Sequence, residues 1–254
     1  MSATISSASV ADVEYVLRIA DSSLILGHRL SEWCGHGPAL EEDIALTNVA
    51  LDLIGQAREL YTHAGALEGS GRDEDQFAFS RSADEFRNVS IVELSNGDYA
   101  HTIVRNFLFT AFQRELWTAL DDSFDSRLVE IARKSLKETQ YHVRHASDWA
   151  IRLGDGTEQS HIRMQRALDV LWPYTAEFFS ASGSGDAVRA GPDWSTLETG
   201  WDRAVRPVLD VATLSVPGRG SFLSRGKEGV HGERMRDLLA EMQHLQRAYP
   251  NCDW

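Results

Sequence analysis

Cysteine is scarce in this chain of 254 residues, and Cys34 and Cys252 stand far apart. Neither cysteine has CxxC or Cys/His spacing, so the sequence argues against a disulfide framework and indicates no zinc site. Long hydrophobic runs are also missing, and the first residues lack the positive charge and apolar core of a signal peptide. We therefore expect a cytoplasmic protein that does not enter a membrane.

Positive charge is in deficit as well. The chain has 25 lysines and arginines against 38 acidic residues, a formal net charge of −13. This balance disfavours nucleic acid or an anionic membrane as the main partner, although a local basic site remains compatible with it. The alternating pattern of β-strands is missing too, which excludes a sheet-based fold.

Helical periodicity is what the sequence has in abundance. The longest periodic stretch, 38–67, begins with Pro38 and an acidic first turn, which are both typical of a helix start. Its apolar residues form two neighbouring rows, which predicts that several other helices bury it. One row contains Leu40, Ile44, Leu51, Ile54 and Tyr61, and the other contains Leu46, Val49, Leu53, Ala57, Leu60 and Ala64.

Spacing and capping residues predict further helices. They span 13–33, 98–120, 125–153, 157–180, 193–213 and 233–247, with a short helix after Ser82. We expect Pro207 to kink or shorten the helix that contains it. The predicted fold is all-α, an antiparallel helix bundle with additional C-terminal helices. Residues 1–10 are predicted to be a flexible tail and 11–254 a single domain.

One polar stripe runs along the helix 38–67 and contains Asn48, Asp52, Gln56 and His63. It could face water or point into the bundle. The sequence favours water, because polar side chains are mostly exposed.

Long antiparallel helices can hold a carboxylate-bridged di-iron site, which needs a Glu from each of two helices and a Glu-x-x-His from each of the other two. Residues three apart share a helix face, so one carboxylate and one imidazole can reach the same ion. The motif occurs at 158–161, 228–231 and 241–244, but the first opens a helix, the second lies in a Gly-rich segment and the third has no twin. The middle of the third long helix, 102–112, contains no acid. A standard di-iron centre cannot be assembled from these residues.

The strongest remaining metal candidate lies on one face of the predicted helix 125–153. It comprises Glu138, His142 and His145, faced either by Asp52 or by Asp98 and His101. Metal ligation is possible in principle. Because buried His and Glu on facing helices more often satisfy each other through hydrogen bonds, a polar network is the favoured interpretation.

A Gly-rich loop near the C-terminus carries Arg219, Arg225 and Lys227. In a chain this acidic, these cations could contact an anion, such as a coenzyme A phosphate, or an acidic partner surface. A solvated loop without such a role is an equally good interpretation.

Several segments closely resemble one known family. They are GHRLSEWCGHGPALEEDIALTNVALDLIGQARELY, DEDQFAFSR, VELSNGDYAHTIVRNF, KETQYHVRHASDWAIRLGDGT and LLAEMQHLQR. The family is that of the structural, non-catalytic subunits of bacterial phenylacetyl-CoA epoxidases. The segments are spread over nearly the whole chain from about Val13 onward, so the resemblance covers the domain and not one site.

The resemblance implies a ferritin-like fold and a role in phenylacetate catabolism. It also implies a catalytic partner subunit of the same fold, which holds a di-iron centre and uses dioxygen to epoxidise the ring of phenylacetyl-CoA. Further epoxidase subunits and an NADPH-dependent reductase with flavin and an iron–sulfur centre complete such a complex. The chain itself would have no catalytic residue and no cofactor, as the degraded ligand motifs also suggest.

Three functional hypotheses follow. The first is a structural subunit in an oxygenase complex. The second is a self-sufficient metal oxygenase that uses Glu138 and His142. The third is a small-ligand or ferritin-like storage protein, which would assemble into large homo-oligomers.

Overall fold

A computed structural model describes residues 10–180, 189–218, 220–250 and 252. Within these ranges the chain is helical, and β-structure is limited to one isolated bridge between Arg225 and Val230. The prediction of an all-α fold is therefore confirmed. Of the predicted tail 1–10, only Val10 is described, and it is the first residue of α1.

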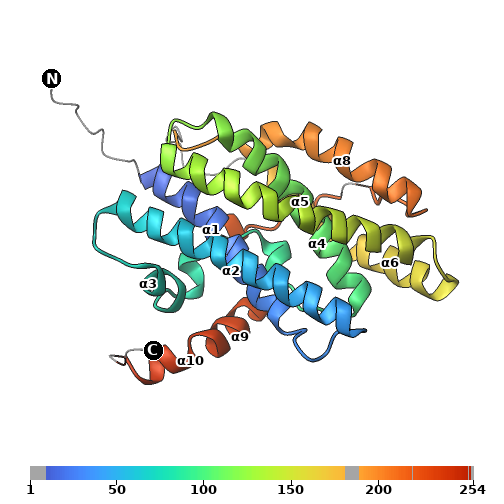
Figure 1. Cartoon of the computed structure of the whole chain (residues 1–254), viewed down its shortest axis with the longest axis horizontal. Helices are drawn as coiled ribbons and strands as arrows, with labels where there is room; N and C mark the ends of the chain where they lie inside the picture. Colours follow the sequence, from blue (N-terminus) through green and yellow to red (C-terminus); the bar gives the residue numbers. More distant parts are fainter. Residues whose placement is uncertain (1–9, 181–188, 219, 251, 253–254) are drawn as a thin grey trace.

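Four long helices form an antiparallel bundle. They are α1 (Val10–Ser31), α2 (Leu40–Glu68), α4 (Tyr99–Ala119) and α5 (Ser126–Gly154). Figure 1 shows α1 beside α2 and α4 beside α5. The late α2 residue Tyr61 donates a hydrogen bond of 2.5 Å to Asp21 in the middle of α1, whereas the earlier Ile54 packs near Gly27. The bundle is the ferritin-like arrangement that the resemblance implies.

Shorter helices cover the bundle. They are α3 (Glu74–Phe79), α6 (Glu158–Leu171), α7 (Ala176–Phe179), α8 (Glu198–Val211), α9 (Glu233–Met242) and α10 (His244–Ala248). Helices α6 and α8 pack on the α4–α5 pair, while α9 and α10 lie on the other side of the molecule, near the short helix α3 (Figure 1). None of the helices in the described ranges is both long and apolar enough to cross a membrane.

Helix boundaries follow the capping residues that the sequence contains. Asp98, Asp125 and Thr157 accept backbone hydrogen bonds at the starts of α4, α5 and α6. At the end of α2, Gly69 adopts φ 70°, a left-handed conformation that glycine reaches without strain.

Three predicted helices differ from the structure. The helix expected over 233–247 is divided at Gln243 into α9 and α10. The helix expected over 157–180 is interrupted by a 3₁₀ turn at Trp172–Thr175, where Pro173 has no amide hydrogen to donate. Pro207, expected to kink or shorten its helix, lies inside α8, which continues to Val211. The buried face of α8, which includes Trp201 and Leu209, compensates for the lost hydrogen bond.

Helix α1 is buried on nearly every side, and its buried residues include Arg18, Asp21 and Arg29. Asp21 has no exposed surface. Its carboxylate accepts hydrogen bonds from Tyr61, from the guanidinium of Arg81 and from the backbone N–H of Arg87. Burial lowers the pKa of Arg81, but the charge of Asp21, together with Tyr61 and the hydrogen bond to Asp21, raises it above its ordinary value. The loop after α3 is thereby fixed to the centre of the bundle.

The apolar row on the outer side of α2 departs from the prediction. Leu40, Ile44 and Leu51 were expected to be buried, but all three are exposed. The prediction that helices surround α2 is wrong on this side, since α1 and α5 pack against its other faces.

We expect Arg81→Met to lower the free energy of unfolding by about 3–5 kcal/mol, because it leaves the Asp21 carboxylate buried without a counter-charge. The matched control is Arg58→Met, which removes an exposed ion pair with Glu74 at 3.2 Å and is expected to cost less than about 1 kcal/mol. Urea unfolding of both variants measures the difference. If both variants lost the same free energy of unfolding, the buried pair of Arg81 and Asp21 would stabilise the fold no more than an exposed ion pair does.

Candidate functional site

The contact between α2 and α5 is lined by a series of polar side-chain pairs, which we call the α2–α5 seam. Each pair joins one residue of α2 to one residue of α5 or of its cap. The pairs are Glu42 with His145 (2.9 Å), Asp52 with His142 (3.0 Å), Gln56 with Glu138 (2.9 Å), Glu59 with Lys134, and His63 with Asp125 (2.6 Å). The antiparallel course of the two helices places each partner opposite the other.

The seam corrects the interpretation of the polar stripe on α2. Gln56 and His63 are buried and Asp52 is half-buried, so the stripe faces α5 and not water. Asn48 alone is exposed as expected. The reason is pairing: each of the inward-facing polar groups meets a polar group of opposite hydrogen-bonding character on α5.

The metal candidates from the sequence are brought together only in part. Glu138, His142 and His145 share the α2-facing side of α5, and Asp52 lies opposite His142, as proposed. The alternative with Asp98 and His101 is wrong. Asp98 is the N-cap of α4 and lies 3.9 Å from Arg163 of α6, away from the seam.

The residues of the seam do not fit a di-iron centre. Within the described residues, no three or more His, Cys, Asp or Glu side chains are arranged to hold a metal ion. Glu42 is an example of a carboxylate that already has partners. One of its oxygens accepts hydrogen bonds from both Tyr99 (2.6 Å) and His145 (2.9 Å). The carboxylates of the seam are occupied by partners from this chain.

The interior next to the seam contains buried polar atoms of three different kinds. The Gln56 Oε1, Thr139 Oγ1 and His142 Nδ1 atoms are buried, and none has a hydrogen-bond partner among the described residues. Amide, hydroxyl and imidazole groups do not supply the negative charge that two ferrous or ferric ions require. This interior can hold neutral polar groups in place, and it has no nucleophile aligned with a base.

The basic loop is placed differently from either interpretation of the sequence. Arg219 lies outside the described residues, and Arg225 forms an ion pair with Glu228. Lys227 is buried: its ammonium donates to the carbonyl of Ser180 at 2.8 Å and lies 5.1 Å from the centre of the Trp194 ring. Burial lowers the pKa of Lys227 to about 8. Lys227 is therefore an internal anchor of the loop, near the Glu177 carboxylate and buried from bulk water.

His231 forms a second internal anchor, just before α9. Its Nδ1 lies 2.6 Å from a carboxylate oxygen of the buried Glu93, and its Nε2 lies 3.0 Å from the carbonyl of Phe86. Both partners are acceptors, so only the doubly protonated ring can donate to both. Burial alone lowers the pKa of His231, but the hydrogen bond and charge of Glu93 raise it above its ordinary value.

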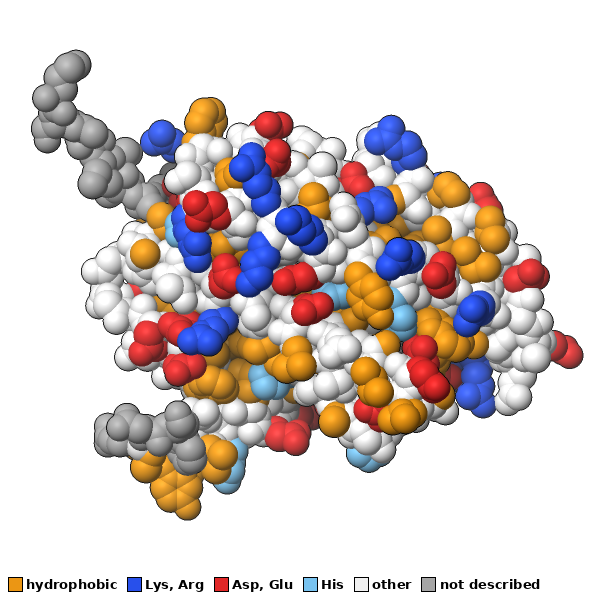
Figure 2. All heavy atoms as spheres, viewed as in Figure 1, with side chains coloured by type: hydrophobic (Ala, Val, Ile, Leu, Met, Phe, Trp, Pro, Cys, Tyr) orange, Lys and Arg blue, Asp and Glu red, His pale blue; other side chains and the backbone are white. Residues whose placement is uncertain are grey.

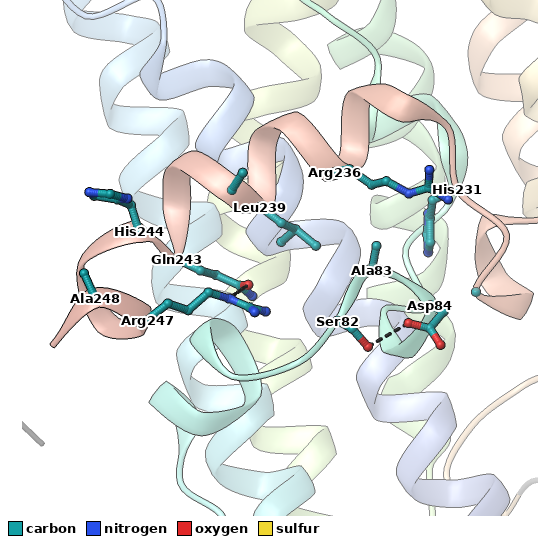
Figure 3. A pocket seen from close by; sticks show the side chains of 12 residues that line it. Ser82, Ala83, Asp84, His231, Arg236, Leu239, Gln243, His244, Arg247 and Ala248 are labelled. Carbon is teal, nitrogen blue, oxygen red and sulfur yellow. Dashed lines mark hydrogen bonds between the residues drawn. The ribbon is translucent and has the colours of Figure 1, made fainter. Parts of the chain in front are cut away.

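A cavity of about 760 Å³ lies away from the seam, between α9–α10 and the 3₁₀ turn Ala83–Glu85. Figure 3 shows Arg236, Gln243 and Arg247 on one wall and Ser82 and Asp84 on the other. Sequence reasoning missed this groove, because its two walls are about 150 residues apart and the local motifs of each wall do not show that the two walls meet.

Comparison with known proteins adds an independent finding. A family model described as "Phenylacetic acid catabolic protein" matches residues 2–254. One of the subunits of the 1,2-phenylacetyl-CoA epoxidase of Escherichia coli (strain K12) is 43% identical over 247 residues, which covers 94% of this chain and 98% of that protein. The similarity therefore extends along the whole fold.

The raised pKa of His231 predicts a pH-dependent stability. The stabilisation is complete below the ordinary histidine pKa of about 6.5 and is lost as the pH rises through the folded-state pKa. We expect His231→Gln to lower the free energy of unfolding by about 1–3 kcal/mol in mild acid, where the ring is charged, and by less at alkaline pH. Urea unfolding across this pH range tests it.

The control is His36→Gln, which changes an exposed histidine before α2. It should leave the pH profile of the wild type unchanged. A constant difference between wild type and His231→Gln at every pH would contradict the protonated pair.

Proposed function

This chain belongs to the phenylacetic acid catabolic protein family, and from this membership we propose that it is a structural, non-catalytic subunit of a phenylacetyl-CoA epoxidase complex. The similarity to the E. coli epoxidase subunit, over nearly the full length of both proteins, supports the proposal most directly. In this role the chain keeps the bundle of an oxygenase and supports the subunit in which the chemistry takes place.

The α2–α5 seam supports a non-catalytic role. A di-iron centre needs four carboxylates and two imidazoles directed at one point inside the bundle. Here Asp52 and His142 bond to each other, and Glu138 bonds to an amide of Gln56. Pairing of this kind stabilises the contact between two helices, and it leaves no set of ligands among the described residues directed at a common ion.

The proposal assigns the cofactors to other subunits. The catalytic partner, of the same fold, would hold the di-iron centre, and a reductase with flavin and an iron–sulfur centre would supply electrons from NADPH. Further epoxidase subunits would complete the assembly. This chain would carry no cofactor and would contribute a surface to the partner.

The alternative is a self-sufficient metal oxygenase that uses Glu138 and His142. It requires both side chains to release their present partners and turn to a shared ion. Since no three carboxylate, imidazole or thiol side chains among the described residues are arranged to hold one ion, we favour the structural subunit.

Iron content tests the proposal. We expect the chain expressed alone in iron-rich medium to contain less than about 0.1 iron per molecule, and the complex with its catalytic partner to contain about two, all held by that partner. The complex should elute as one species in gel filtration and epoxidise phenylacetyl-CoA when the reductase is present. Metal analysis and turnover assays measure these outcomes.

The matched variant is Glu138→Ala, which removes the only carboxylate of the candidate set on α5. It should leave the iron content and turnover of the complex within about twofold of wild type, since its loss costs one polar contact. Two irons bound to the isolated chain, and lost in Glu138→Ala, would overturn the proposal in favour of the alternative.

A further inference from the structure

Helix α2 exposes a stripe of large apolar side chains. Leu40, Ile44 and Leu51 are 72%, 52% and 61% exposed. At 100° per residue they fall within roughly 40° of one another around the helix, so they form one continuous line. Single exposed apolar residues are ordinary on protein surfaces, but a line of them along one helix is the pattern of a helix that packs against another.

Gly55 extends this stripe by one turn beyond Leu51. Neither the backbone conformation nor the packing of the isolated chain requires a glycine at this position. It is exposed, it lies in the middle of a regular helix, and a Cβ atom built on it would meet nothing within 4 Å. Glycine at such a position destabilises a helix relative to alanine. A glycine in a helix face allows another backbone to approach closely, so its position indicates contact with a group outside this chain.

The neighbouring helix α5 presents an outer ridge on which cations are accompanied by the exposed acids Glu130 and Asp148, although basic residues outnumber acidic ones in this helix. Between Ser126 and Gly154 it has six arginines and lysines against three acidic residues. Three of these cations, Arg127, Arg133 and Lys134, form ion pairs, but neither Lys137 nor Arg144 forms one with a carboxylate of the described residues. Between them lies Tyr141, which is 42% exposed and has the Arg144 guanidinium 5.9 Å from its ring centre.

The stripe and the ridge are adjacent. The seam joins α2 and α5 along their length, and the Asp52–His142 and Gln56–Glu138 pairs place Leu51 and Gly55 at the same level as Tyr141 and Lys137. Figure 2 looks onto this side of the molecule and shows hydrophobic side chains beside histidines where α5 meets α2, with lysines and arginines along α5. We call this surface the α2/α5 outer face; it comprises Leu40, Ile44, Leu51, Gly55, Lys137, Tyr141 and Arg144.

We propose that the α2/α5 outer face binds an amphipathic helix of the catalytic subunit, with the apolar side of that helix on α2 and a border of Asp and Glu side chains against α5. The inference rests on the proposed function, and it names the surface through which this chain would bind the catalytic subunit. Charge complementarity selects this occupant over a second copy of the chain. Two copies paired through this face would bring together two helices in which basic residues outnumber acidic ones, within two molecules that each carry a net charge of −13.

Gly55→Ala gives the sharpest test, because it should change stability and binding in opposite directions. In the isolated chain, alanine in an exposed helix interior should raise the Tm by about 1–3 °C. In the complex, the added methyl group should hold the partner helix away and weaken binding by about tenfold or more. Thermal unfolding of the chain and titration calorimetry with the purified catalytic partner measure the two effects.

Charge and apolar contact are tested separately. Ile44→Glu with Leu51→Glu should weaken binding by at least about 100-fold, whereas Ile162→Glu, the same kind of exchange at an exposed helical site on α6, should change it by less than about twofold. Lys137→Glu with Arg144→Glu should slow association and remove most of its salt dependence.

The outcomes separate this inference from the proposed function. If the wild type binds the catalytic partner and the Ile44→Glu/Leu51→Glu variant binds equally well, the surface is wrong and the proposed function stands. A wild-type chain that forms no complex overturns the proposed function itself. Self-association of the isolated chain that Ile44→Glu/Leu51→Glu abolishes would assign the face to a second copy and overturn the inference.

Discussion

A carboxylate with no access to water determines how this protein must fold. Asp21 lies in the middle of α1, a helix buried on nearly every side, and an unpaired charge at that position would be strongly destabilising. Its partners come from α2, through Tyr61, and from the loop after α3, through Arg81 and the backbone of Arg87. The bundle and the loop that covers it therefore have to assemble together, because neither can satisfy Asp21 alone.

The same requirement explains why the polar residues of the α2–α5 seam pair with one another. Most polar groups inside a bundle bind an ion or bind each other, because burial without a partner costs free energy. In the seam they bind each other, as with His63 and Asp125, where burial raises the pKa of Asp125 but the hydrogen bond from His63 and two backbone N–H groups lower it below its ordinary value. Side-chain pairs of this kind satisfy the polar groups between two helices and hold the shape of the bundle.

The helices could be predicted from the sequence because their signals are local. Asp98, Asp125 and Thr157 cap helices wherever a periodic stretch follows them. The burial of particular side chains could not be predicted, because it depends on contacts between distant segments. Lys227 in a Gly-rich loop has the local pattern of a solvated cation, yet the carbonyl of Ser180 and the ring of Trp194 enclose it. Helical periodicity also located the polar and the apolar stripes of α2, but it could not decide which of the two faces α5.

Helix α2 has polar side chains on the side that faces α5 and apolar side chains on the side that faces water. This is the reverse of the arrangement that is most favourable in a monomer. The side that faces α5 carries Asp52, Gln56 and His63, whereas the side that faces water carries Leu40 and Ile44. Folding of the chain alone would gain more from the opposite arrangement, since apolar surface is stabilised by removal from water and polar pairs are costly to bury. The arrangement becomes favourable when the outer side is buried as well. Under the proposed function, the chain would contribute a helix with a polar seam inside the subunit and an apolar contact with the catalytic partner.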